Sequence, residues 1–224
     1  EIRGSIKEEQ SWQMTYADMM TLLFAFFVLL FSISSIDPVK ISQLKDGMGD
    51  KPDLKSFNTI SEEFKDIIEE LEIEDQAKVS RDPRGVTLEI DGDICFQSGS
   101  TRIHSTLQKV LNASAEKIFS QLGDPRLIIV EGHTDSDPMY NNPTYPTNWE
   151  LSSARAANVV NYLIFKGVMS GRLTASGYAD VWPAGATWTE VRSGEVDDNY
   201  ISEKNSTLEQ RTKNRRIKII FGVK

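Results

Sequence analysis

A single carboxylate interrupts a long apolar stretch near the start of this sequence. Residues 16–36 read YADMMTLLFAFFVLLFSISSI, and Asp18 is the only charged residue among them. As a helix this stretch is about 31 Å long, which matches a hydrocarbon core of about 30 Å. An ionised carboxylate at the centre of a membrane helix costs about 2.5–3.5 kcal/mol, so such a residue usually faces a partner or a water path. The pattern therefore makes Asp18 a candidate functional residue within a membrane span.

Two alternatives concern how deep Asp18 lies in the membrane and whether the span is retained or cleaved. Asp18 could lie at the membrane surface, with its side chain in water. Trp12 and Tyr16 argue against this, because such aromatic residues mark the headgroup level and Asp18 follows them along the helix. A cleaved signal peptide would have a shorter apolar core, of about 7–15 residues, and a cleavage site of small residues, which is absent before Asp37. We therefore expect a retained anchor, although the count of Lys and Arg on its two sides leans weakly against an N-terminus in the cytoplasm.

The composition excludes several other kinds of chemistry. The chain has 224 residues, a net charge of -8, one Cys and two His, which fits one span and one modest domain. An acidic chain gives no electrostatic reason to expect nucleic-acid binding. Cys95 alone cannot form an internal disulfide, and we expect it to be a small core residue; no metal-ligand spacing is present. His133 and Ser152 lack a nucleophile elbow, so we expect neither an enzyme nor a cofactor.

Residues 37–58 have the composition of a linker between the span and a folded domain. Pro38 ends the membrane helix, and Gly and Pro recur over the following residues. A second helix is predicted over residues 59–76, because Thr59 and Glu62 form a capping box and apolar residues recur at helical spacing. We expect its apolar stripe to pack on the domain that follows, or on a second copy of the chain.

Residues 77–224 alternate strand and helix patterns. Strands that alternate with helices predict an α/β sandwich, in which helices cover one face of a mixed sheet. Ser105 with Gln108 and Thr147 with Glu150 predict capping boxes for its two helices. The polar segment 181–211 is longer than most loops and is predicted to be a functional or mobile insertion. The predicted strands are 86–90, 127–130, 173–177 and 216–221, and the predicted helices are 105–122 and 148–165.

The second of these helices carries a recognisable pattern. It matches N-x2-L-S-x2-R-A-x2-V-x3-L, which resembles the peptidoglycan-binding signature of OmpA-like domains. The upstream GHTD and the late KNRRIKI add to this resemblance, which covers residues 86–223. The matching residues are Asn148, Leu151, Ser152, Arg155, Ala156, Val159 and Leu163.

The membrane stretch carries a second resemblance. SWQMTYADMMTLLFAFFVLLFS is similar to the span of the MotB/PomB stator subunits of the flagellar motor. A span with this Asp, followed by an OmpA-like domain, is more specific than either half alone. The sequence therefore resembles a MotB-type B subunit of a bacterial stator. The resemblance implies residues 1–15 in the cytoplasm, one crossing of the inner membrane and residues 77–224 in the periplasm.

The OmpA-like resemblance implies a binding site for a peptidoglycan peptide stem. It assigns the ammonium and the carboxylate of diaminopimelate, or of another stem residue, to Asp135 and Arg155, with Asn148 and Thr134 shaping the site. The chemistry agrees, because a zwitterion needs a carboxylate for its ammonium and a planar guanidinium for its carboxylate. Two alternatives stay open: Asp135 could form a turn, and Arg155 could pair with an acid on the helix surface. The loop 137–147 departs from the shorter spacing common in the family.

The stator resemblance implies an ion-driven mechanism. Asp18 matches the ion-carrying Asp of that family, whose charge is removed by a proton or by Na⁺. One helix cannot shelter an ion path, so the resemblance implies a MotA/PomA-type ring of A subunits around a homodimer of B chains. Residues after Pro38, among them Val39, Ile41 and Leu44, would be the plug that blocks ion leakage until the domain anchors to peptidoglycan.

The sequence leaves the ion and the use of the motor open. Thr21, Ser32 and Ser34 bind helix carbonyls as readily as they would line a sodium path, so the proton is expected only as the commoner case among relatives. A stator-like motor could serve a non-flagellar system such as phage defence. A passive membrane-anchored peptidoglycan tether, in which Asp18 is incidental, is the other alternative.

Overall fold

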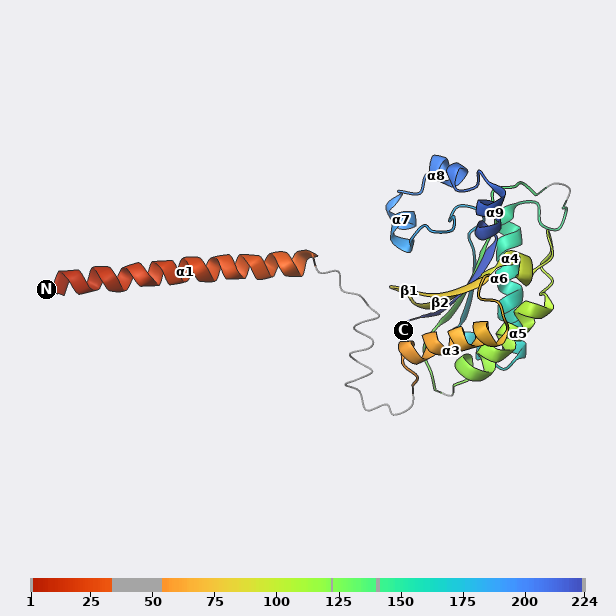
Figure 1. Cartoon of the computed structure of the whole chain (residues 1–224), viewed down its shortest axis with the longest axis horizontal. Helices are drawn as coiled ribbons and strands as arrows, with labels where there is room; N and C mark the ends of the chain where they lie inside the picture. Colours follow the sequence, from red (N-terminus) through yellow and green to blue (C-terminus); the bar gives the residue numbers. More distant parts are fainter. Residues whose placement is uncertain (1, 34–53, 122, 140–141, 223–224) are drawn as a thin grey trace. The chain divides into compact units, whose positions relative to one another are not determined.

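The chain folds as two separate compact units. The computed structural model describes residues 2–33, 54–121, 123–139 and 142–222, and for residues 2–11 and Ile33 it describes the backbone alone. The two units are Glu1–Asp37 and Pro38–Lys224, and each is described by itself. Figure 1 shows a long helix in the first unit and a sheet with helices in the second.

Helix α1, Ile2–Ile33, is the whole described part of the first unit. Of the described residues, one stretch of helix is long and apolar enough to cross a membrane, Trp12–Ser32. The helix begins well before residue 16, where the predicted span starts, because no Pro interrupts the upstream residues and most of them are good helix formers. The last residues of the predicted span, 34–36, lie outside the described residues.

Helix α3, Phe57–Glu70, opens the second unit and packs on the core of the domain, as predicted. Ser56 caps its first turn, because its hydroxyl accepts the Thr59 N–H at 3.1 Å. The prediction that Thr59 is the cap is therefore wrong. The earlier start lets Phe57, which is fully buried, join the apolar stripe. The helix stops short of residue 76, because Glu72 has a φ of 55°, outside the helical region.

The described residues form a five-stranded sheet in the order β1-β2-β5-β3-β4. Strands β3 and β4 are parallel, and all other neighbours are antiparallel, which confirms the predicted mixed sheet. Strand β1 was not predicted, because its sequence AKVSRD has few apolar residues; it lies at the edge of the sheet, and only Ala77 is buried. The strands are β1 Ala77–Asp82, β2 Gly85–Asp91, β3 Ile128–His133, β4 Leu173–Gly177 and β5 Arg216–Gly222.

Helices α3, α5 and α6 lie on one face of the sheet, as predicted (Figure 1). Helix α6 opens on the predicted capping box of Thr147 and Glu150. The capping box predicted at Ser105 is wrong: His104 precedes the helix, and the Gln108 side chain donates to the Ile103 carbonyl at 3.3 Å. The bounds are α5 Ser105–Ser114, a π-helical turn η1 Ala115–Phe119, α6 Asn148–Phe165, and the single turns α4 Gly92–Cys95 and η2 Ser170–Arg172.

Cys95 confirms the expectation of a small core residue. It is fully buried in the apolar cluster between the sheet and its helices. Burial raises the pKa of its thiol well above the usual range. Because the thiolate is the reactive form, the side chain is an inert part of the core.

The opposite face of the sheet is polar and is covered by the segment after β4. Strand alternation turns Glu131, His133, Arg216 and Lys218 to this face, and all four are buried. Trp182 lies over them, with Lys218 Nζ 4.9 Å and the His133 ring 5.7 Å from its ring centroid. Burial lowers the pKa of Lys218 to about 8, and burial beside Arg216 keeps the pKa of His133 well below its ordinary value.

Three short helices replace much of the polar loop predicted over residues 181–211. They are α7 Trp188–Ser193, α8 Asp198–Glu203 and α9 Leu208–Asn214, and the first two bury no residue. Without a buried stripe they show no helical periodicity of apolar residues, which explains why the pattern did not predict them. Each begins instead on a side-chain cap, provided by Thr187, Asp197 and Thr207.

Candidate functional site

A hollow of about 360 Å³ brings the four predicted site residues of the second unit together. Asp135 and Thr134 directly follow β3, and Asn148 and Arg155 come from the first two turns of α6. Apolar Phe96 and Leu151 line the hollow together with charged side chains. A small zwitterion would therefore meet both charge signs within one hollow.

A pair of glycines sets how closely α6 approaches the sheet. Gly132 of β3 and Gly177 of β4 are in register. A Cβ atom at Gly132 would lie 2.2 Å from the Ser152 carbonyl oxygen, and one at Gly177 would lie 2.2 Å from Ser153 Oγ. Only residues without a Cβ fit under the backbone of α6 here. This close contact places Arg155, one turn further along, over the hollow.

Arg155 is oriented by backbone carbonyls rather than by an acid. It is 5% exposed, and it donates from Nε to the Ser100 carbonyl at 3.0 Å and from Nη2 to the Gln97 carbonyl at 3.3 Å. Nη1 has no hydrogen-bond acceptor among the described residues. Burial, and then nearby Arg215, lower the pKa of Arg155. The alternative of a surface ion pair is wrong, and one guanidinium nitrogen, Nη1, is left without an acceptor among the described residues.

Asp135 is part of a network that the sequence did not predict. It is 7% exposed, and Oδ2 accepts from Arg215 Nη1 at 2.6 Å. Arg215 also donates from Nε and Nη2 to the two carboxylate oxygens of Asp93, each at 3.1 Å. These bonds to Asp93 and Asp135 raise the pKa of Arg215. Asp135 Oδ1 accepts the Asp137 N–H at 3.3 Å, which confirms the turn-forming role.

Asp93 and Arg215 are thus site residues that the sequence reasoning missed. Arg215 lies in the KNRRIKI motif, which gave the only signal, but nothing in that motif assigned it a partner. Asp93 lies in α4, where no motif marks it. The hollow is thus lined by two guanidinium groups, of Arg155 and Arg215, and by three carboxylates, of Asp93, Asp135 and Asp137.

Asn148 and Thr134 shape the loop that follows β3. Asn148 Nδ2 donates to the carbonyl oxygens of Asp135 at 3.1 Å and Asp137 at 3.0 Å. The Thr134 N–H donates to the Ala179 carbonyl at 2.8 Å, while its buried hydroxyl has no partner among the described residues. These contacts hold the loop, so both residues act on the position of the Asp135 carboxylate.

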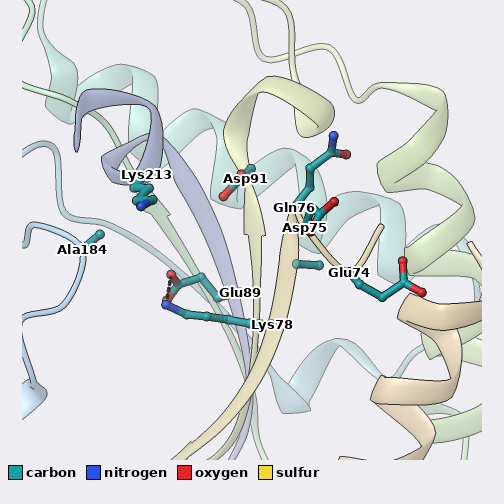
Figure 2. Close-up of a pocket in the computed structure, with 9 residues that line it drawn as sticks. Glu74, Asp75, Gln76, Lys78, Glu89, Asp91, Ala184 and Lys213 are labelled. Carbon is teal, nitrogen blue, oxygen red and sulfur yellow. Dashed lines mark ion pairs between the residues drawn. The ribbon is translucent and has the colours of Figure 1, made fainter. Parts of the chain in front are cut away.

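A second hollow, of about 220 Å³, lies beside the edge strand β1 and contains none of the predicted site residues. Figure 2 shows the ion pair of Lys78 and Glu89 in its lining, with Nζ and Oε1 3.0 Å apart. Burial raises the pKa of Asp91, and Glu89 and Asp93 add to the effect. Four carboxylates and two ammonium groups, one of them on Lys213, line it, so the hollow is acidic on balance.

Asp18 belongs to the other unit and lies on the apolar part of α1. Its backbone carbonyl accepts the Thr21 hydroxyl at 2.8 Å, so Thr21 bonds the helix itself. The Asp18 carboxylate has no partner among the described residues. The predicted plug residues Val39, Ile41 and Leu44 lie outside the described residues.

Comparison with known proteins identifies the family. A model described as membrane MotB of the proton-channel complex MotA/MotB matches residues 3–51, and an OmpA family model matches residues 95–195. Motility protein B of Bacillus subtilis is 25% identical over 95% of this chain and 90% of that protein. The Bacillus subtilis protein YtxE is 32% identical over 97% of this chain and 92% of that protein. This chain belongs to the MotB-like family.

The MotB-like assignment agrees with both units. The OmpA match contains all four predicted site residues, whereas Asp93 and Arg215 lie outside it. A solved structure, the cell wall anchor of the T6SS from Pseudomonas aeruginosa, is 26% identical with a TM-score of 0.55, and the match covers 71% of this chain and 97% of that one. Helix α1 and the MotB match fit an inner-membrane anchor.

Proposed function

We propose that this MotB-like chain is the B subunit of an ion-driven stator unit that is anchored to peptidoglycan. The observation that carries the proposal is the presence, in one MotB-like chain, of a carboxylate on a helix long and apolar enough to span a membrane and of a hollow with opposite charges at Asp135 and Arg155. The partners would be a ring of MotA/PomA-type A subunits and a second B chain. The span would lie in the inner membrane, with its N-terminus in the cytoplasm and the OmpA-like domain in the periplasm.

The hollow suits the free end of a peptide stem. The Asp135 carboxylate would accept the stem ammonium, and Arg155 Nη1 would donate to the stem carboxylate. Charge-assisted hydrogen bonds of this kind are about twice as strong as neutral ones. Arg215 already neutralises part of the Asp135 charge, so the ammonium would share this carboxylate with a guanidinium held in place by Asp93.

Ion passage would use Asp18. A proton or Na⁺ at this carboxylate removes its charge and changes how the helix sits against the A ring, and each cycle would advance the ring around the anchored B dimer. One charge that crosses about 100 mV releases about 2.3 kcal/mol, which is several times RT. That is enough work per ion to drive a conformational step.

The Asp18→Asn variant should abolish ion-driven output, because an amide is isosteric with the carboxylic acid but cannot exchange its charge. Swimming, or ion leak through the complex with the A subunits, would be measured at equal amounts of protein in the membrane. Glu9→Gln, which makes the same acid-to-amide change before the span, is the control and should keep its output. Unchanged output in Asp18→Asn would refute the motor function.

The Asp135→Asn variant should bind purified peptidoglycan about 10- to 100-fold more weakly, because a charge-assisted hydrogen bond contributes about 1.5–3 kcal/mol. Sedimentation of the full chain with peptidoglycan sacculi, in detergent, measures this. Asp198→Asn, an exposed acid in α8, is the control and should bind as the parent does. Equal binding by both variants would place the stem elsewhere.

A passive anchor is the second candidate, and the similarity to a T6SS cell wall anchor favours it. Such a protein needs the hollow but not the intramembrane charge. It would lose its function with Asp135→Asn and keep it with Asp18→Asn, whereas a stator subunit would lose function with either change.

A further inference from the structure

The insertion between β4 and β5 contains a buried pair of amides. Asn205 follows α8 and is 5% exposed, and Asn214 ends α9 and is 2% exposed. Asn214 Nδ2 donates to Asn205 Oδ1 at 2.8 Å and to the Lys204 carbonyl at 2.9 Å, and Asn205 Nδ2 donates to the Ile201 carbonyl at 2.8 Å. Fully bonded buried polar groups specify one arrangement of the segments they join. The pair therefore fixes α8 against the end of α9.

The same two amides bind segments beyond these helices. Asn214 Oδ1 accepts the Ala184 N–H at 2.7 Å, which attaches the segment after Trp182. Asn205 Oδ1 accepts the Ser136 N–H at 3.1 Å. Ser136 lies in the loop after β3, between Asp135 and Asp137. The insertion is thereby hydrogen-bonded to the residue next to the candidate ligand carboxylate.

The loop 135–137 is held from two sides. Asn148 of α6 donates to the carbonyls of its first and last residues, and Asn205 of the insertion accepts the N–H between them. Without Asn205, the Ser136 N–H would have no acceptor among the described residues. The peptide between Asp135 and Ser136 would then be held at its carbonyl by Asn148 alone, so the backbone next to the Asp135 side chain would have one anchor instead of two.

We propose that Asn205 is a positioning residue of the binding site, and that residues 181–214 form a brace behind the Asp135 loop. This inference rests on the proposed binding of a peptide stem at Asp135. Asn205 does not line the hollow and carries no charge, so it acts through the backbone that follows Asp135. The second link from the insertion, Arg211 to Asp137 at 3.4 Å, is partly exposed and contributes little, as exposed ion pairs do.

The test is binding of the full chain, in detergent, to purified peptidoglycan sacculi. Asn205→Ala should bind about tenfold more weakly, the factor that corresponds to one unpaired buried hydrogen-bonding group. Asn199→Ala is the matched control, because it makes the same change at an exposed position of the neighbouring helix α8. It should bind as the parent does. Equal binding by the two variants would overturn the inference.

A double variant separates positioning from a general loss of stability. If Asn205 acts through Asp135, Asn205→Ala should cause no further loss in an Asp135→Asn background. A full additional tenfold loss there would overturn the proposal. The proposed function fails in a different way: Asp135→Asn would then bind as the parent does. Loss of binding in Asp135→Asn, with none in Asn205→Ala, would overturn the brace alone.

Hydrogen exchange of the unmutated chain gives a test that does not depend on the folding of a variant. With no peptidoglycan present, the Ser136 amide should exchange more slowly than an exposed loop amide, because it donates to the side chain of Asn205, which is buried. Exchange at the rate of an exposed loop would show that the brace does not hold the loop, and would overturn the proposal.

Discussion

The Asp124→Asn variant should lose about 3–5 kcal/mol of the free energy of unfolding, because it leaves buried guanidinium groups without their carboxylate. The Asp124 side chain is fully buried, in the segment that precedes β3. Its carboxylate accepts from Arg126 Nε at 2.9 Å and from Arg126 Nη2 at 2.6 Å. Arg172 Nη2 lies 3.9 Å from the same carboxylate and has no other partner among the described residues.

Neither Arg126 nor Arg172 can move its guanidinium group into the solvent without breaking other contacts. Both guanidinium groups lie over the Phe221 ring, that of Arg126 at 4.6 Å and that of Arg172 at 5.7 Å from the centroid. Arg126 also donates to the Lys55 carbonyl, and Arg172 donates to the Phe119 carbonyl. The cluster thus joins the start of α3 and the end of η1 to the base of the sheet. Loss of one charge affects three segments at once.

Urea unfolding of the full chain in detergent, followed by far-UV circular dichroism, measures the effect. Asp75→Asn is the control, because Asp75 is exposed and has no partner among the described residues. Its free energy of unfolding should stay within about 0.5 kcal/mol of the parent. If both variants unfolded at the same urea concentration, the buried cluster would contribute nothing to stability.

Gly132→Ala should cost about 3 kcal/mol and weaken peptidoglycan binding as well. The new Cβ would lie 2.2 Å from the Ser152 carbonyl oxygen, which belongs to the backbone of α6 and cannot rotate away. Overpacking of this kind typically costs about 1–3 kcal/mol, and a backbone contact lies at the upper end. Relief requires α6 to move off the sheet. Asn148 and Arg155 move with it, so binding and stability should fall together.

Thermal unfolding and sedimentation with peptidoglycan would measure the two effects. Gly171→Ala is the matched control: it makes the same change in the same domain, where an added Cβ meets nothing within 4 Å. It should leave both measurements unchanged. If Gly132→Ala had the melting temperature and the peptidoglycan binding of Gly171→Ala, then α6 would tolerate a shift away from the glycines.

Apolar periodicity and capping patterns correctly predicted helices that bury an apolar stripe of their own. Helix α6 begins and ends as predicted, because the capping box of Thr147 and Glu150 coincides with the start of its stripe. The capping-box pattern is also present at Ser105 and Thr59, but neither residue is the cap of its helix. Whether such a residue caps a helix depends on its backbone conformation, and burial of neighbours such as Phe57 decides where the first turn begins.

Contacts between distant residues were beyond the reach of these signals. The resemblance assigned Asp135 and Arg155, and the structure brings them into one hollow. It could not assign the bonds of Arg215 to Asp93, which cross almost the whole domain sequence. The support that Asn205 gives to Ser136 depends in the same way on how an insertion folds back on the sheet.

The central place of β5 has a consequence for the order of events during synthesis and export. Strand β5 follows all the other described strands in the chain, yet it is the only link between β2 and β3. Until residues 216–222 have been made, the sheet is in two unconnected parts, and long-range pairing of this kind is slow to form. In the proposed topology the domain would therefore cross the membrane unfolded and collapse only after β5 arrives. A subunit whose export stalls before Arg215 would lack both the central strand and part of the binding site, and so could not attach to the cell wall prematurely.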